Sequence, residues 1–530
     1  MIKKLLADKN NLFWFFSLLA IFTFLVEAIV LIFYRETWFD ELNYLWKSYL
    51  ILKGSLIPFQ DIILEYPPLF VPIYGLGQIL FGPSFYIGRL TSAVLSVFLL
   101  ILVFLVAKKM SSRWWGLAAV FAVLSNLLLM GNYISATLYS LAAVLVMAVF
   151  WIETSDINRK KKIYFSAILL GLMMLTRINL LPVVFIFLAY FIFLKIKWVE
   201  IALFCGLILA VISLGYLPVV WANPDLALSN ILQPFYSFGP MKELSSGIVG
   251  GQSFLNFFST LVGFLKEFYS FLLLFSAVIF YALFENRKNI GNFLKQESVF
   301  FLISLTALVL LATHFFYWRL EGKIYYANYF MPLIIISIVV GIARFLPKNK
   351  AIITVFIFSL LLNFSINLYR TDVLSSPREE SDLARVAKGS EFLAENTKTG
   401  DKILAFDNSI FHVFAADRTI FPPLINRDFL YAPGLSMEKA KELKFYNFEM
   451  FKDWLLKEAD YVVINKEQWS LSFLKSDYWG FQKREGNKEV EEIKNILSQN
   501  YKIVGAAENV YPRKYTEGND EGTLELYKRK

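Results

Sequence analysis

The stretch Trp38-Phe39-Asp40-Glu41 places two carboxylates directly after a long apolar run, residues 12–33. A second apolar run follows Arg89, and both runs are long enough to cross a bilayer. A charged group at a membrane boundary is costly unless it has a partner or a function. The loop between the two runs, residues 34–87, is therefore the first place to look for a site.

The residues after the acidic pair have the spacing of an amphipathic helix that ends near Gly54. We expect this helix to lie flat in the headgroup region, with its polar face turned to whatever lies above it and forming the candidate active surface. Glu65-Tyr66-Pro67-Pro68 follows, where the prolines enforce an extended backbone. The polar face would carry Asp40, Asn43, Tyr44 and Lys47, and the apolar face Phe39, Leu42, Leu45, Trp46, Tyr49 and Leu50.

The composition is that of a polytopic membrane protein. Of the 530 residues 57% are hydrophobic, against about 45–50% in a soluble domain. The net charge of +9 comes largely from short Lys and Arg clusters between apolar runs, which is typical of cytoplasmic loops and gives no reason to expect nucleic acid. Cys205 is the only cysteine, so a disulfide framework within the chain is excluded.

The placement of the basic clusters predicts a transmembrane domain over residues 1–371 in the plasma membrane, with 11 spans and a cytoplasmic N-terminus. Residues 67–81 are too short to span and are expected to be re-entrant or interfacial. A turn at Gly131-Asn132-Tyr133 would join two of the spans. A long outer loop, residues 222–267, is expected to be a mobile cover or a binding loop.

Beyond residue 371 the pattern becomes that of a soluble protein. Residues 383–396 read as an amphipathic helix, and strands are expected at 402–406, 461–464, 501–504 and 523–527. We predict that residues 372–530 form a small extracytoplasmic α/β domain.

Three outward carboxylates are the candidate catalytic groups. Asp40 and Glu41 are adjacent, so on a helix they point about 100° apart and cannot both address one reacting atom. We expect Asp40 to be the base and Glu41 its companion, with Glu65 as the third acidic group. An interfacial acidic pair bonded to helix ends is an equally good interpretation of the residues alone.

Four cations, Arg89, Arg177, Arg319 and Lys323, fall at the outer ends of predicted spans. Guanidinium groups bind phosphate in a fork geometry, so these residues are candidates for a donor phosphate site. For any one of them, snorkelling to lipid headgroups is the simpler explanation. His314 and His412 have no ligand partners at metal-binding spacing, so we expect no zinc site and no cofactor, while the sequence leaves a divalent-metal requirement open.

The order of these motifs resembles the GT-C membrane glycosyltransferases, close to the aminoarabinose-transferase and protein O-mannosyltransferase group. The resemblance lies in Asp40-Glu41, Tyr66-Pro67-Pro68-Leu69, Gly82 and Arg89-Leu90, followed by Gly171…Thr176-Arg177 and Arg319…Tyr326…Pro332. Tyr66 stands where the aminoarabinose transferases have lysine.

The resemblance implies transfer of a hexose or pentose from a polyprenyl-phosphate donor to a lipid, glycan or protein acceptor on the outer face of the membrane. By matching position, Asp40 would activate the acceptor, and attack would invert the anomeric carbon. Tyr44, Tyr66 and Tyr326 would contact substrate.

Two other classes stay open at this point. A lipid or glycan transporter or flippase would also need outward cations and carboxylates, but no symmetry-related broken helices are evident. A receptor or assembly scaffold could use residues 372–530 to bind a partner.

Overall fold

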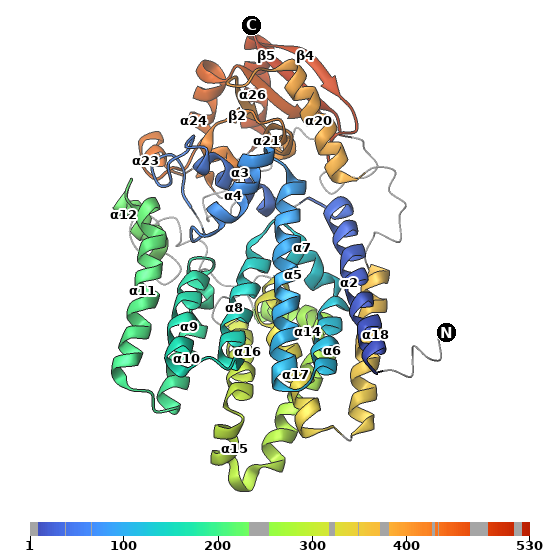
Figure 1. The fold of residues 1–530 in the computed structure, drawn as a ribbon. Coiled ribbons are helices and arrows are strands. Elements are labelled where there is room, and N and C mark those ends of the chain that lie inside the picture. Colours follow the sequence, from blue (N-terminus) through green and yellow to red (C-terminus); the bar gives the residue numbers. More distant parts are fainter. Residues whose placement is uncertain are drawn as a thin grey trace. The chain divides into compact units, whose positions relative to one another are not determined.

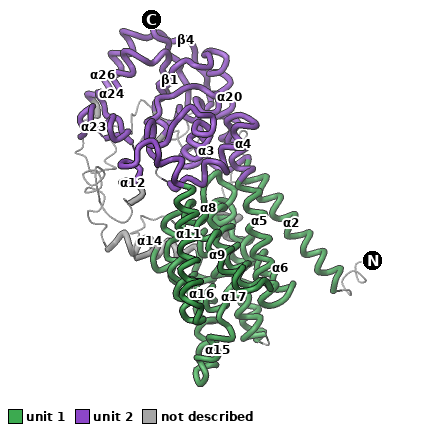
Figure 2. The backbone as a smooth tube through the Cα atoms, turned by 60° about the vertical axis from the view of Figure 1, so that its left-hand side comes forward, with its two compact units in different colours: residues 1–32, 92–215, 252–377 green, residues 33–91, 216–251, 378–530 purple. Residues whose placement is uncertain are grey.

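The computed structural model describes residues 9–37, 39–64, 66–232, 254–316, 324–347, 349–370, 381–426, 430–432, 434–466, 486–512 and 522–530. The chain folds into two compact units that are each built from three separate segments. Unit 1 comprises Met1–Ile32, Ser92–Gly215 and Gln252–Pro377, and unit 2 comprises Phe33–Thr91, Tyr216–Gly251 and Arg378–Lys530 (Figure 2).

Unit 1 is a bundle of apolar helices (Figure 1). Its α-helices, some of which extend into unit 2, are α2 (Lys9–Tyr34), α5 (Phe85–Met110), α6 (Arg113–Leu124), α7 (Leu127–Ile134), α8 (Leu138–Thr154), α9 (Arg159–Met174), α10 (Leu181–Phe193), α11 (Trp198–Val220), α14 (Phe254–Glu285), α15 (Ile290–Gln296), α16 (Ser298–Phe316), α17 (Met331–Phe345) and α18 (Lys350–Arg370). Three short helices join them: η1 (Ile178–Leu180), η2 (Arg287–Asn289) and η3 (Ile324–Tyr329).

The chain is a multi-pass helical membrane protein, as its composition predicts. Four helical stretches among the described residues, Lys9–Tyr34, Phe85–Met110, Trp198–Val220 and Phe268–Glu285, are each long and apolar enough to cross a bilayer. Two further pairs of helices qualify if each bent pair counts as one span, and several shorter apolar helices accompany them. The count of 11 spans stays a prediction.

The turn expected at Gly131-Asn132-Tyr133 is wrong, because these residues lie inside α7. The break falls earlier, between α6 and α7, where the axis bends by 80°. Asn126 caps the new helix by accepting a hydrogen bond from the Leu129 amide at 3.0 Å. The chain then leaves the helix at Ser135. The long loop expected at 222–267 is likewise shorter, since α14 begins at Phe254 and α12 (Pro224–Leu232) occupies its start.

Helix α17 forms the core of unit 1. Its residues from Met331 to Ile342 are all buried, and it packs against α6, α14 and α16. Gly341 allows the close approach to α14, because a Cβ there would lie 2.1 Å from the Val278 side chain. An apolar helix surrounded on all sides by other helices is typical of the centre of a membrane domain.

Unit 2 combines the stretch around the acidic pair with the polar C-terminal segment. From the first it takes α3 (Phe39–Leu52) and α4 (Phe70–Phe81). The second forms a five-stranded sheet in the order β2-β1-β3-β5-β4, with β1 parallel to β2 and β3, and β5 antiparallel to β3 and β4. The strands are β1 (Lys402–Ala405), β2 (Thr419–Ile420), β3 (Tyr461–Asn465), β4 (Tyr501–Ala507) and β5 (Leu524–Arg529).

The helices of the C-terminal segment surround this sheet (Figure 1). They are α20 (Asp382–Asn396), α21 (Ile410–Ala415), α23 (Met437–Glu442), α24 (Phe448–Asp453) and α26 (Gly486–Asn500), with the short η4 (Asp407–Ser409), η5 (Pro422–Asn426) and η6 (Trp454–Glu458). The predicted helix at 383–396 and all four predicted strands are confirmed. Strand β2 was not predicted, because a strand of two residues is too short to show the alternation of apolar and polar side chains.

The helix predicted after the acidic pair is confirmed as α3, and Gly54 follows its end at a φ of +74°. The expectation that it lies flat in headgroups is wrong. Its apolar face is buried against protein: Leu42 and Leu45 are fully buried, and the Trp46 ring lies 5.7 Å from that of Phe414 in α21. The C-terminal segment covers the surface that lipid was expected to cover.

Candidate functional site

Glu41 and Arg89 form a buried two-pronged ion pair at the start of α3. The Arg89 Nε donates to Glu41 Oε1 at 2.9 Å, and its Nη2 donates to Oε2 at 2.8 Å. The same guanidinium also donates to the carbonyl oxygens of Arg35 and Glu36, each at 2.9 Å. Both side chains are almost completely buried. Arg89 in α5 therefore ties down the chain entering α3 and the first turn of the helix.

This geometry changes two of the expected roles. Four of the five N–H donors of the buried Arg89 bond to protein oxygens, which leaves no two-pronged fork for the donor phosphate that it was expected to bind. Glu41 is enclosed with its partner and is placed to hold the helix rather than to meet a substrate. Successive side chains on a helix point about 100° apart, so Asp40 cannot point in the same direction as the buried Glu41 carboxylate. Asp40, the other member, is half-buried.

The polar face of α3, which is the candidate active surface, is covered by protein beyond its first turn. Tyr44 and Lys47 are each 1% exposed. Residues 62–64 and 66–75 fold back over them, and the Lys47 Nζ donates to the Ile63 carbonyl at 3.2 Å. The Tyr44 ring lies 4.9 Å from that of Tyr66 and 5.4 Å from that of Phe70. Tyr44 therefore packs the α3–α4 contact, while Tyr66 keeps a half-buried position beside it.

In unit 1, Arg177 lies among tyrosines. Its guanidinium is 5.8 Å from the centre of the Tyr139 ring. The centre of the Tyr139 ring lies 6.5 Å from that of the Tyr326 ring and 5.7 Å from that of the Tyr329 ring. Two predicted site residues, Arg177 and Tyr326, are thus brought to one cluster by Tyr139. The sequence carried no signal for Tyr139, which reads as one more aromatic residue in an apolar helix.

The local fold explains why Arg177 lies there. Helix α9 ends at Met174, and the Arg177 amide donates to the Met173 carbonyl at 3.0 Å as the chain turns into η1. The short η3, which carries Tyr326 and Tyr329, packs against α7 and α8. The Tyr133 hydroxyl secures it by donating to the Asn328 carbonyl at 2.7 Å. A guanidinium lying over an aromatic ring can still bind phosphate through its edge.

Three of the predicted site residues, Glu65, Arg319 and Lys323, lie outside the described residues. Asp40 belongs to unit 2 and Arg177 to unit 1. Their convergence in a single pocket therefore stays a prediction.

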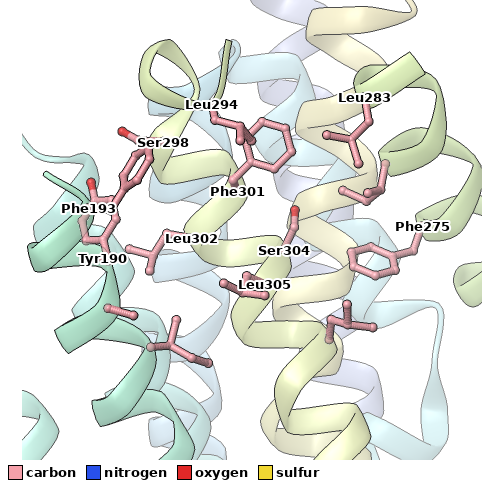
Figure 3. Close-up of a pocket in the computed structure, with 14 residues that line it drawn as sticks. Tyr190, Phe193, Phe275, Leu283, Leu294, Ser298, Phe301, Leu302, Ser304 and Leu305 are labelled. Carbon is pink, nitrogen blue, oxygen red and sulfur yellow. The ribbon is translucent and has the colours of Figure 1, made fainter. Parts of the chain in front are cut away.

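An apolar cavity of about 480 Å³ lies within unit 1, between α10, α14, α15 and α16. Phe193, Phe275 and Phe301 line it, and the hydroxyls of Ser298 and Ser304 are among its few polar atoms (Figure 3). Such a cavity suits a hydrocarbon chain and offers no set of groups for chemistry on a polar substrate. Among the described residues, no group of three or more His, Cys, Asp or Glu side chains could hold a metal ion.

Comparison with known proteins identifies the fold. No protein-family model matches the chain, and no curated protein does. Among solved structures, apo ArnT from Cupriavidus metallidurans aligns with a TM-score of 0.56 and 12% identity over 98% of both chains. ArnT bound to undecaprenyl phosphate gives 0.53 and 13%, again over 98% of both chains.

A second group of neighbours is archaeal. The oligosaccharyltransferase AglB from Archaeoglobus fulgidus, in complex with an inhibitory peptide and a dolichol-phosphate, aligns with a TM-score of 0.51 and 12% identity, over 97% of this chain and 89% of AglB. These neighbours are GT-C membrane enzymes. The chain therefore has the polytopic helical fold with a small C-terminal sheet that its motifs predict.

Proposed function

We propose that this protein is a membrane glycosyltransferase that moves a sugar from a polyprenyl-phosphate carrier to an acceptor on the outer face of the membrane. The observation that carries the proposal is the division of the acidic pair. Glu41 is locked to Arg89, and this fixes the first turn of α3, where Asp40 is a half-buried residue. A base needs such a fixed position, because misplacement of a catalytic group lowers the rate strongly.

The fold neighbours supply the donor class. ArnT and AglB are described with undecaprenyl phosphate and dolichol-phosphate respectively, and we extend that class of carrier to this chain. In this proposal Arg177 binds the phosphate with its tyrosine neighbours, and Arg319 and Lys323 join it. The apolar cavity between α10, α14 and α16 is available to a hydrocarbon chain in the same unit.

The reaction follows from these positions. The Asp40 carboxylate takes the proton of an acceptor hydroxyl, and the acceptor oxygen attacks the anomeric carbon. The bond from that carbon to the phosphate oxygen breaks, and the configuration inverts. Polyprenyl phosphate leaves with the electron pair, and the cations near the phosphate stabilise the charge that develops there. Glu65, Tyr66 and Tyr326 are the proposed contacts to the substrate. The proposed topology places the N-terminus on the cytoplasmic side of the membrane.

Substitution Asp40→Asn tests the base. General-base catalysis contributes about 10²–10⁴-fold, so we expect at least a hundredfold loss of transfer of a radiolabelled sugar from a polyprenyl-phosphate donor series. Fluorescent-lipid flux in proteoliposomes is measured on the same samples. The matched control is Asp453→Asn, which removes a half-buried carboxylate that pairs with Lys457. Transfer by Asp40→Asn at the wild-type rate, or lipid flux without any glycosyl product, would contradict the proposal.

A further inference from the structure

A second cavity, of about 410 Å³, lies within unit 2 and away from the acidic pair. It is lined by the end of α3 and the following turn, by the starts of β1 and β2, and by η6. Its volume falls in the range of about 300–1,000 Å³ that small-molecule sites occupy. Asp40 and this cavity are at opposite ends of α3, so the cavity is a separate site on the same helix.

The charged groups around the cavity are paired with one another. Lys53 Nζ lies 3.5 Å from Asp417 Oδ2, and Lys402 Nζ lies 2.9 Å from Glu458 Oε2. Each of these side chains is between 40% and 49% exposed. A ligand here therefore meets donors and acceptors side by side, with little net charge among these four groups. Hydroxyl groups, which both donate and accept, match such a lining.

Arg418 also lines the cavity and adds one positive charge, but most of its donors are already used by the protein. Its guanidinium makes four hydrogen bonds to protein oxygens, at 2.8–3.0 Å, on Ala394, Thr397 and Ala416. These bonds fix the wall next to Asp417. These bonds use four of its five N–H donors, so a phosphate or carboxylate ligand that binds Arg418 in a two-pronged fork would have to displace one of them.

The floor of the cavity is aromatic. The rings of Phe421 and Trp454 stack with their centres 4.8 Å apart and their planes at 23°. Leu50 and Leu56 complete the apolar part. A sugar ring has an apolar face of C–H groups, whose partial positive charge suits the negative face of an aromatic ring. An apolar floor under a rim of paired polar groups is therefore complementary to a saccharide.

Asp417 takes an unusual conformation for its place. It follows the end of α21 with a φ of +50°, the left-handed conformation for which glycine is the usual choice at a helix end. Its carboxylate accepts a hydrogen bond from the Tyr49 hydroxyl at 3.0 Å, and that hydroxyl accepts one from Lys53 Nζ at 2.8 Å. Through Tyr49 the cavity is connected to the helix that carries Asp40.

We propose that this cavity binds an uncharged saccharide, and that the saccharide is part of the acceptor. The second half of the statement rests on the proposed transferase function, whereas saccharide binding itself does not. A peptide is the poorer occupant, because the sheet edge at the cavity, β2, has only two residues and offers little backbone to an extended chain.

Binding is measured on the full-length protein in nanodiscs, by titration calorimetry and saturation-transfer NMR, with cellobiose, mannobiose and N-acetylchitobiose as neutral probes and inorganic phosphate as the charged one. We expect at least one disaccharide to bind and phosphate not to compete. Glu458→Gln and Asp417→Gly should each weaken that binding about tenfold, through loss of a hydrogen bond to a charged group. Asp417→Gly also relaxes the backbone, so unfolding cannot explain the loss.

The control Glu442→Gln breaks an exposed ion pair outside the cavity and should bind the disaccharide as wild type does. The variant Asp40→Asn should bind it equally well while losing transfer. Failure of every disaccharide to bind, binding by the two cavity variants as tight as that of the wild type, or competition by phosphate would overturn the inference. Absence of transfer in the wild type with saccharide binding intact would refute the proposed function and leave the cavity assignment standing.

Discussion

At the scale of residues, two neighbouring carboxylates with the same chemistry have opposite environments. Glu41 is enclosed with Arg89, and Asp40 is only half-buried. Taking both charges of a buried pair out of water is costly, and the pair repays that cost only while both members are present. The Glu41–Arg89 pair is therefore a stability element on which the position of Asp40 depends.

Removing one member of this pair should destabilise the protein more than removing both. We expect Glu41→Gln to lower the free energy of unfolding by about 3–5 kcal/mol, because it leaves the Arg89 charge buried without a counter-charge. The double variant Glu41→Leu with Arg89→Met should lose less. Thermal unfolding in detergent measures the difference. Glu442→Gln, in an exposed pair, should stay within about 1 kcal/mol of wild type. A double variant less stable than Glu41→Gln would show that the pair is not the anchor.

At the scale of elements, α3 departs most from its predicted setting. Its amphipathic spacing is real, but both faces meet protein. The polar face is covered by the return of the chain into α4, with the Ser48 Oγ donating to the Phe70 carbonyl at 3.3 Å. Gly75 makes this approach possible, since a Cβ at that position would lie 2.7 Å from the Ser48 carbonyl oxygen. The contact is between backbones and cannot relax by turning a side chain.

Gly75→Ala should therefore destabilise the α3–α4 contact by about 1–3 kcal/mol, the usual cost of overpacking. Gly206→Ala is the matched control, because Gly206 in α11 has open space around it and a Cβ there meets nothing within 4 Å. A helical alanine is favoured over glycine by about 0.5–1 kcal/mol, so this control should be neutral or stabilising. The measurement is the thermal unfolding midpoint of each variant. Equal midpoints for the two variants would contradict the close packing of α3 on α4.

At the scale of the whole molecule, the compact units do not follow chain order. Unit 2 combines residues 33–91 with residues 378–530, which are separated in the sequence by most of the apolar helices. The aromatic residues of α21 hold the two parts together. The ring centre of Phe411 lies 6.3 Å from that of Phe39 and 5.8 Å from that of Phe85, and the ring centre of Phe414 lies 5.2 Å from that of Phe85. The C-terminal segment therefore completes its core with residues that precede it by more than 300 positions.

A fragment of residues 378–530 should expose this aromatic surface. We expect it to self-associate and to bind an apolar dye, because Phe411 and Phe414 lose the rings that cover them. The double substitution Phe411→Ser with Phe414→Ser should reduce the dye signal of the fragment. Ile503→Ser is the control, since Ile503 is 56% exposed in the intact chain. A fragment that is monomeric and does not bind dye would show that residues 378–530 fold independently of residues 33–91.

The sequence by itself determined the class of fold, because composition and hydrophobic runs report directly on transfer from water to lipid. It also determined the positions of α3, α20 and four of the five strands, although not every boundary, because periodicity and glycine placement act locally. Tertiary structure alone decided what covers each face. Three features depend on contacts between distant segments: the burial of Tyr44 and Lys47, the enclosure of Arg89 by protein oxygens, and the cluster around Arg177. The sequence could not show them, because an amphipathic face has the same pattern whether lipid or protein covers it.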